Sequence, residues 1–328
     1  MRWLTLAVVV LGCCLLPTPA FAAGPITVTV RTAPQLAGVR FVFDGRTGVT
    51  GTDGTARFTG AHDFNGHTLA VDDGELGSAD KEFSFARWAG QRDPDQAFRR
   101  TVSGLPLRAD YTVTAAFTAR FRVTLRCVDQ DGKAVPRALV PKVTVRSDTG
   151  RTQRLPMGRP VWLDGLRPVY RKSVLTSRRV GYVLLSANAY GANTVDAGRQ
   201  RFRPAEEREV TLTTPLHDLT VSARDAVFGS EAGSTARVTL PDGSVRAVPF
   251  GDDRTATLRN LPHGRYEVEV TGGNGLRAEQ QIRLSRTQSV QVRVVSRADL
   301  TLAAGVLATV ALGLLLAGRR LRRRRGGV

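Results

Sequence analysis

Apolar and charged residues alternate in Arg265-Tyr266-Glu267-Val268-Glu269-Val270 and again in Val290-Gln291-Val292-Arg293-Val294. A period of two is the pattern of a β-strand with one buried face. Residues 235–240 and 244–250 flank Pro241-Asp242-Gly243, which is a strong turn signal. Together with residues 219–223, 255–258 and 277–284, these segments predict seven short strands, as is typical of a β-sandwich.

The same alternation extends outward toward the N-terminus. Apolar residues recur at every second position in two further segments: Ile26, Val28 and Val30, and Phe121, Val123, Leu125 and Cys127. Helical periodicity is scarce between the two ends of the chain. We therefore predict an all-β fold of about three tandem Ig-like β-sandwich modules, followed by one C-terminal transmembrane helix. Cys127 is expected to be a buried thiol.

Two quoted stretches of the C-terminal module carry a family resemblance. Residues 238–244, VTLPDGS, and residues 258–268, LRNLPHGRYEV, resemble prealbumin-like modules, which include carboxypeptidase regulatory-like and collagen-adhesin B-type domains. Residues 52–58 and 128–136 are similar to hairpins of the same group. The resemblance implies a surface module of bacterial, in particular actinobacterial, single-pass proteins, and it implies no specific ligand. Many adhesin-type members carry a Lys–Asn isopeptide bond, which residues 216–297 exclude because they contain no lysine.

The N-terminus has the features of a secretory signal. Arg2 precedes an uncharged apolar run over residues 3–16, and Ala20-Phe21-Ala22 supplies a small-x-small cleavage pattern. The run is too short to span a bilayer as a helix. An alternative is lipidation at Cys13, although Leu11 fits a lipoprotein cleavage box poorly.

The C-terminus has the features of a membrane anchor. Residues 300–318 carry no charge, and as a helix they would be about 28 Å long. Six arginines follow the span directly: Arg319, Arg320, Arg322, Arg323, Arg324 and Arg325. The positive-inside rule places these residues in the cytoplasm, where they can hold anionic lipid headgroups. Gly305, Thr309 and Gly313 leave helix dimerisation open, because small residues are also common in any such span.

These features predict the organisation of the chain. We expect a signal peptide at 1–22, β module 1 at 23–118, a basic β module 2 at 119–215, a prealbumin-like β module 3 at 216–298, a transmembrane helix at 299–318 and a cytoplasmic tail at 319–328. The expected location is the cell membrane, with the N-terminus outside. No Leu-Pro-x-Thr-Gly precedes the span, so sortase attachment is not supported.

Positive charge is concentrated in the middle of the chain. The 328 residues have a formal net charge of +18, and 43 of the 47 basic residues are arginine. Residues 119–215 carry a net charge of +11, against −1 for residues 24–118 and +1 for residues 216–299. Biased coding explains arginine in place of lysine, but it does not explain this concentration. A solvated basic surface without a ligand remains the alternative.

The middle segment suggests an anion-binding surface. Arg199, Arg201 and Arg203 alternate with Gln200 and Phe202, so a strand would turn Phe202 inward and the three guanidinium groups outward, to one side. Arg178 and Arg179 are further candidates. Guanidinium groups bind phosphate and carboxylate in bidentate fashion. The anions expected outside a membrane are wall polymers and lipid headgroups, whereas nucleic acid is not expected there.

The sequence contains no recognisable catalytic motif. It lacks G-x-S-x-G, a phosphate loop and H-E-x-x-H. His62 and His67 flank a polar turn and do not complete a zinc site, and Asp129 and Asp131 are interpreted as turn residues rather than calcium ligands. His217 lies at a module boundary and His263 lies in a turn. We therefore predict no catalytic residue, no metal and no cofactor.

Three functional hypotheses follow, from different classes. The first is a non-enzymatic envelope protein that is structural, adhesive or anion-binding through the middle module. The second is an accessory subunit that docks another membrane or secreted protein at the envelope. The third, an enzyme with a spatially assembled site, has no support from the sequence.

Overall fold

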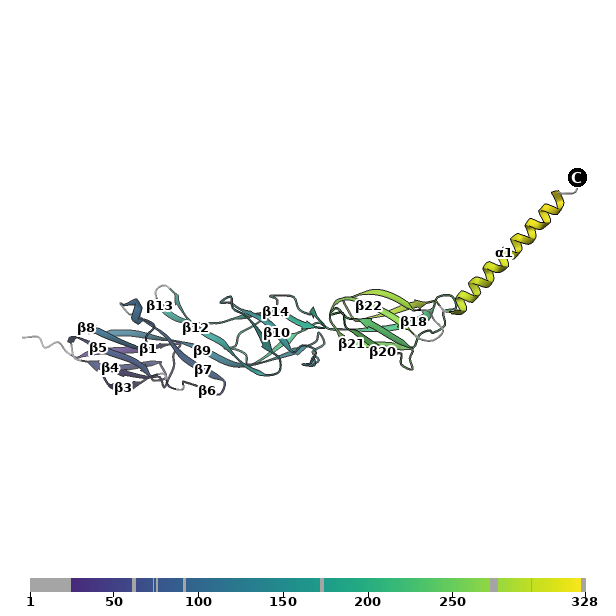
Figure 1. Cartoon of the computed structure of the whole chain (residues 1–328). Coiled ribbons are helices and arrows are strands. Elements are labelled where there is room, and N and C mark those ends of the chain that lie inside the picture. The colour runs from purple at the N-terminus through teal and green to yellow at the C-terminus, as the bar shows by residue number, and fades with distance from the viewer. Residues whose placement is uncertain are drawn as a thin grey trace, which may run out of the picture. The chain divides into compact units, whose positions relative to one another are not determined.

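The computed structural model describes residues 25–60, 63–72, 74, 76–90, 93–171, 174–271, 277–295 and 297–325. Over these ranges the chain is built from β-strands in five sheets, and it ends in one long helix, α1 Arg297–Arg325 (Figure 1). This confirms the predicted all-β fold with a C-terminal apolar helix. The predicted signal peptide, including Cys13, lies outside the described residues.

The chain divides into two compact units. Unit 1 comprises Met1–Leu76, Ser84–Phe117 and Pro168–Ser177, and unit 2 comprises Gly77–Phe83, Thr118–Arg167 and Arg178–Val328. The boundary between the two units crosses β9 between Phe117 and Thr118, inside a single unbroken strand. The division into three modules at 118 and 215 stays a prediction.

Unit 1 contains two facing sheets and the aromatic residues that lie between them. Its strands are β1 Ile26–Ala33, β2 Arg40–Phe43, β3 Arg46–Val49, β4 Thr55–Gly60, β5 Asp63–Asp72, β8 Thr101–Leu107 and parts of β7 Lys81–Ala89, β9 Tyr111–Val128, β12 Pro160–Arg171 and β13 Val174–Arg179, with the short 3₁₀ helix η1 Pro94–Gln96. Strand β1 pairs with β4 and β9, whereas β2 pairs with β3 and β5. The rings of Phe43 and Phe58, one from each sheet, lie 5.5 Å apart.

Unit 2 begins with a second sandwich. One layer contains the later part of β9 with most of β12, β17 Glu209–Thr213, β6 Gly77–Ser78 and the start of β7, which belong to the same eight-stranded sheet as β1. The other layer is a five-stranded sheet of β10 Lys142–Ser147, β11 Thr152–Pro156, β14 Tyr182–Ala189, β15 Ala192–Asn193 and β16 Arg201–Phe202. Leu125, Val145 and Leu184 are fully buried in its core. Cys127 is buried as predicted, and burial raises the pKa of its thiol to about 11.

Unit 2 continues with a third sandwich, in which all seven strands predicted for residues 216–297 are confirmed. One sheet contains β18 His217–Asp225, β21 Thr255–Leu261 and β24 Gln288–Val294, and the other contains β19 Thr235–Thr239, β20 Val245–Pro249, β22 Gly264–Thr271 and β23 Ala278–Leu284. Tyr266, Val268 and Val270 face the core, as the alternation predicts. The predicted turn forms a tight loop in which the Leu240 amide donates to the Ser244 carbonyl.

The connection between the two sandwiches of unit 2 is fastened at several points. The Thr214 amide and hydroxyl both donate to the Val128 carbonyl, at 2.8 and 3.1 Å. The Gln200 side chain donates to the Thr213 carbonyl at 2.7 Å and accepts from the Thr213 amide at 2.8 Å. The Leu216 amide donates to Gln130 at 2.9 Å. These bonds fix the path of the chain from β17 into β18.

Helix α1 is the one helix in the described ranges that is long and apolar enough to cross a membrane. The qualifying segment is Asp299–Ala317, which almost coincides with the predicted span. Its leucines are exposed to solvent, with Leu307 and Leu314 each 70% exposed. Such a surface is unfavourable in water, so the helix needs an apolar environment.

Candidate anion-binding site

The predicted arginine stripe has the expected alternation. Phe202 is buried and stacks on Tyr182 with ring centroids 5.4 Å apart, while Arg199, Arg201 and Arg203 are exposed. Only Arg201 and Phe202 belong to a regular strand, β16, which pairs with β14. The burial of Phe202 therefore turns the neighbouring guanidinium groups outward, without placing all three on one strand.

Carboxylates neutralise much of this surface. Arg199 pairs with Asp196 at 3.3 Å, and Arg178 pairs with Asp148 at 3.3 Å. Glu206 lies 2.7 Å from Arg179 and 3.3 Å from Arg203. Among the described residues, no carboxylate lies within 4.0 Å of the Arg201 guanidinium. Exposed pairs contribute little free energy, so an external anion can compete for these arginines.

A groove of about 750 Å³ lies within unit 2, at the junction of its two sandwiches. The groove is lined by the segment that follows β15, by the connection between the sandwiches, and by the facing ends of β22 and β23. The lining residues are Thr194, Val195, Asp196, Arg199, Gln200, Thr213, Pro215, His217, His263, Gly264, Arg265, Arg283, Leu284 and Ser285. The groove thus collects three arginines and two histidines against one carboxylate.

One histidine of the groove has a shifted pKa. Burial lowers the pKa of His217, repulsion from His263 lowers it further, and the carboxylate of Asp218 opposes both effects. His217 is half-buried and His263 is exposed. A neutral imidazole carries one N–H donor and one acceptor nitrogen, so both rings can donate to an anion in either protonation state.

Most of this groove was not predicted from the sequence. Arg199 was a predicted site residue, but no role was predicted for Arg265 or Arg283, and no link was predicted between His217 and His263. These residues are far apart in the sequence and are brought together by strand register and by the fastened connection. A usable signal was present: Arg265 precedes Tyr266 and Arg283 follows Ile282, and these two apolar residues are paired on the buried face of the hairpin, which places the two arginines opposite each other.

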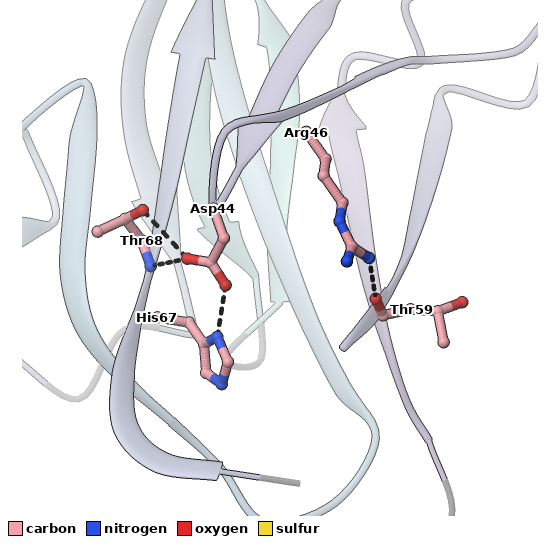
Figure 2. A network of polar contacts seen from close by, with 5 residues as sticks. All are labelled: Asp44, Arg46, Thr59, His67 and Thr68. Atoms are coloured by element: carbon pink, nitrogen blue, oxygen red, sulfur yellow. Dashed lines mark hydrogen bonds and ion pairs between the residues drawn. The ribbon is translucent and has the colours of Figure 1, made fainter. Parts of the chain in front are cut away.

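A polar network in unit 1 involves His67, one of the two histidines considered above (Figure 2). Its Nδ1 lies 2.5 Å from Oδ2 of Asp44, and the Thr68 amide donates to Oδ1 of the same carboxylate at 2.8 Å. The ring of His67 stacks on Phe43 at 5.4 Å. Nearby, Arg46 donates to the Thr59 carbonyl at 3.2 Å. The network ties the turn after β2 to β5, which is a structural role.

Asp44→Asn is expected to destabilise unit 1 at neutral pH by about 1–2 kcal/mol, because it removes a charged acceptor from two partners. Burial acts to raise the pKa of Asp44, but the hydrogen bonds from Thr68 and His67 outweigh it and lower the pKa. The stabilisation is therefore present above the unfolded-state pKa and is lost as pH falls below about 4. The difference in free energy of unfolding between the variant and the wild type is measured by urea unfolding at neutral and acidic pH, followed by Trp88 fluorescence in a Trp162→Phe background.

Asp72→Asn is the matched control for this prediction, because Asp72 forms an exposed ion pair with Arg40 at 3.1 Å. We expect it to cost less than about 1 kcal/mol. Equal effects of the two substitutions at neutral pH would show that the Asp44 network adds nothing beyond an ordinary surface pair.

Other polar candidates have local structural roles or lie outside the described part. Asp129 accepts hydrogen bonds from the amides of Asp131 and Lys133, both at 2.9 Å, so it shapes a turn as predicted. His62 lies outside the described residues. Within the ranges that the structure describes, no group of three His, Cys, Asp or Glu side chains is placed to hold a metal ion.

No family model matches the sequence, and no curated protein matches it. Among solved structures, the chain is similar to the Bacillus anthracis TIE protein, with 9% identity and a TM-score of 0.31 over 83% of this chain and 51% of that chain. It is also similar to a streptococcal ancillary pilin, with 11% identity and a TM-score of 0.24 over 84% of this chain and 100% of that chain. A third similar structure is the pilus adhesin SpaC from Lactobacillus rhamnosus GG, with 11% identity and a TM-score of 0.29 over 83% of this chain and 43% of that chain. This chain spans about half the length of the TIE protein. At these TM-scores the likenesses carry no argument about function.

Proposed function

We propose that the chain is a non-enzymatic bacterial envelope protein with a structural or adhesive role, held by a single membrane span. The observation that carries the proposal is α1, whose apolar residues are exposed along the whole span. The signal-like N-terminus and the arginine run after the span support an N-terminus outside and a short tail inside. In this orientation the β-sandwiches face the cell exterior.

The basic segment 119–215 is the proposed contact with anions of the envelope. Arg199, Arg201 and Arg203 are exposed, and their existing partners are exposed carboxylates of low energetic weight. Anionic wall polymers are the proposed partner, because a repeating chain can engage several such weak contacts at once. Lipid headgroups are the competing ligand, and stoichiometric co-purification of another protein would favour the accessory-subunit hypothesis instead.

Replacing Arg199, Arg201 and Arg203 together with Gln is expected to weaken binding to poly(glycerol phosphate) about tenfold at low salt, since each exposed contact contributes up to about 1 kcal/mol. Wild-type binding is expected to fall steeply as salt rises from about 0.05 to about 0.5 M. The measurement uses the full chain in a nonionic detergent, with the six tail arginines replaced by Gln so that the tail binds no polymer. Unchanged binding by the triple variant would remove these residues from the site.

A further inference from the structure

Two arginines face each other directly on neighbouring strands of unit 2. In the antiparallel pairing of β22 with β23, Arg265 is the register partner of Arg283. Both side chains are exposed, and within the described residues neither forms an ion pair with a carboxylate. Like charges in directly opposed positions destabilise a sheet. The hairpin therefore keeps two adjacent cations, neither within 4.0 Å of a described carboxylate, and an anion bound between them would stabilise the pair.

The groove adds further donors around this pair. Arg199 approaches from the neighbouring sandwich, and His217 and His263 supply imidazole N–H groups. The single carboxylate in the lining, Asp196, is paired with Arg199, and both side chains are largely exposed. The acidic residues nearest in sequence to the arginine pair and to His217 are Glu267 and Asp218, and neither lines the groove.

The groove is also held in shape before any ligand arrives. Gln200, one of its lining residues, is fixed to Thr213 by two hydrogen bonds, and Thr213 lines the same groove. Leu284 is fully buried beneath the β23 end of the groove. Donors that are already oriented bind a ligand with less loss of conformational entropy than donors on mobile loops.

We infer that this groove is a binding site for a linear anionic polymer, whose phosphodiester or carboxylate groups bind between Arg265 and Arg283 and continue past Arg199 toward Arg201. This inference rests on the proposed anion-binding function and adds a site from a part of the chain with almost no net charge. Guanidinium forks match both phosphate and carboxylate oxygens. A concave groove receives a single polymer strand, whereas a flat bilayer surface does not enter it.

The test compares Arg265→Gln/Arg283→Gln with the wild type in the same tail-neutral full chain. Poly(glycerol phosphate) and polygalacturonate are titrated separately at low salt, so that the two arms distinguish a phosphodiester from a carboxylate ligand. We expect the double variant to lose about tenfold or more in affinity for the polymer that the groove prefers. We also expect its melting temperature to be unchanged or higher, because the substitution removes like-charge repulsion.

Two further variants separate a site from a general charge effect. Arg31→Gln/Arg57→Gln removes two exposed arginines from the neighbouring strands β1 and β4, outside the basic segment, and is expected to change affinity less than about twofold. Arg265→Lys/Arg283→Lys keeps the charge and loses the bidentate fork, so an intermediate affinity is expected.

The outcomes distinguish the inference from the proposed function. If the wild type binds and the groove variant binds equally well, the groove is excluded while the anion-binding function stands. Equal losses in the groove variant and the β1–β4 variant would likewise exclude the groove, since they would report total charge alone. If the wild type binds neither polymer, the anion-binding function itself is wrong, and the groove site is excluded with it.

Discussion

Removal of residues 300–328 is expected to move the protein from the membrane fraction to the culture medium almost completely. The removed segment contains the apolar, exposed part of α1 that is long enough to cross a membrane. Burying each leucine of such a helix in lipid is worth about 1.5–3 kcal/mol, so the whole segment provides effectively permanent anchoring. Fractionation of cells, with immunodetection of the sandwich units in pellet and medium, measures the change.

The control for this truncation replaces only the six tail arginines with Gln. That variant is expected to stay in the membrane fraction, because positive charge sets the orientation of a span rather than its insertion. A truncated chain that still pellets after a salt wash would contradict anchoring by the helix alone. Lipidation at Cys13, or a tightly bound membrane partner, would then become the better explanation.

Much of the fold was predictable from local pattern. In β22, Tyr266, Val268 and Val270 alternate with charged residues, and this pattern alone predicts the strand and its buried face. Phe202 was placed inward by the same reasoning, and its stacking on Tyr182 confirms this. Asp129 was interpreted as a turn residue because no acidic ligand follows at the expected calcium-loop position, and its two amide contacts confirm this.

The sharing of strands between units was not predictable in the same way. The period-two pattern of β9 keeps one phase from Val113 to Cys127, with Ala116 as an additional buried residue, so this pattern alone does not predict that one strand serves two units. Residues 168–177 likewise belong to unit 1, although Pro168 to Arg171 are the end of β12, whose earlier part belongs to unit 2. These features depend on pairings between distant segments, whereas the period-two pattern reports only which face of a strand is buried.

The candidate site shows the same limit for charged residues. Residues 119–215 were predicted to bind anions because that segment has the largest excess of basic residues. Residues 216–299 carry almost no net charge, yet they contribute Arg265 and Arg283 to the groove. Net charge averages over a segment and hides a local cation pair, since Glu267 and Glu269 in the same strand balance it in the count.

Trp88→Ala is expected to destabilise unit 1 by about 3–5 kcal/mol, a large part of the stability of a typical domain. Trp88 is fully buried, and its ring lies 5.9 Å from Phe41 and 5.2 Å from Phe85. Its indole nitrogen donates to the Arg99 carbonyl at 2.9 Å. Truncation therefore leaves a large cavity among aromatic rings and an unpaired carbonyl. Calorimetry of the full chain should show one transition shifted down by roughly 15–30 °C.

Two substitutions test whether burial is the cause of this loss. Phe98→Ala removes an aromatic ring that is 65% exposed and contacts Arg87 at 4.8 Å, so we expect a cost below about 1 kcal/mol. Trp88→Phe keeps most of the buried ring and loses the bond to Arg99, so an intermediate cost of about 1–3 kcal/mol is expected. Trp88 and Phe98 both belong to unit 1, so the melting temperature of the unit 2 transition should be unchanged in all three variants. A Trp88→Ala shift no larger than that of Phe98→Ala would refute the central position of this side chain in the core.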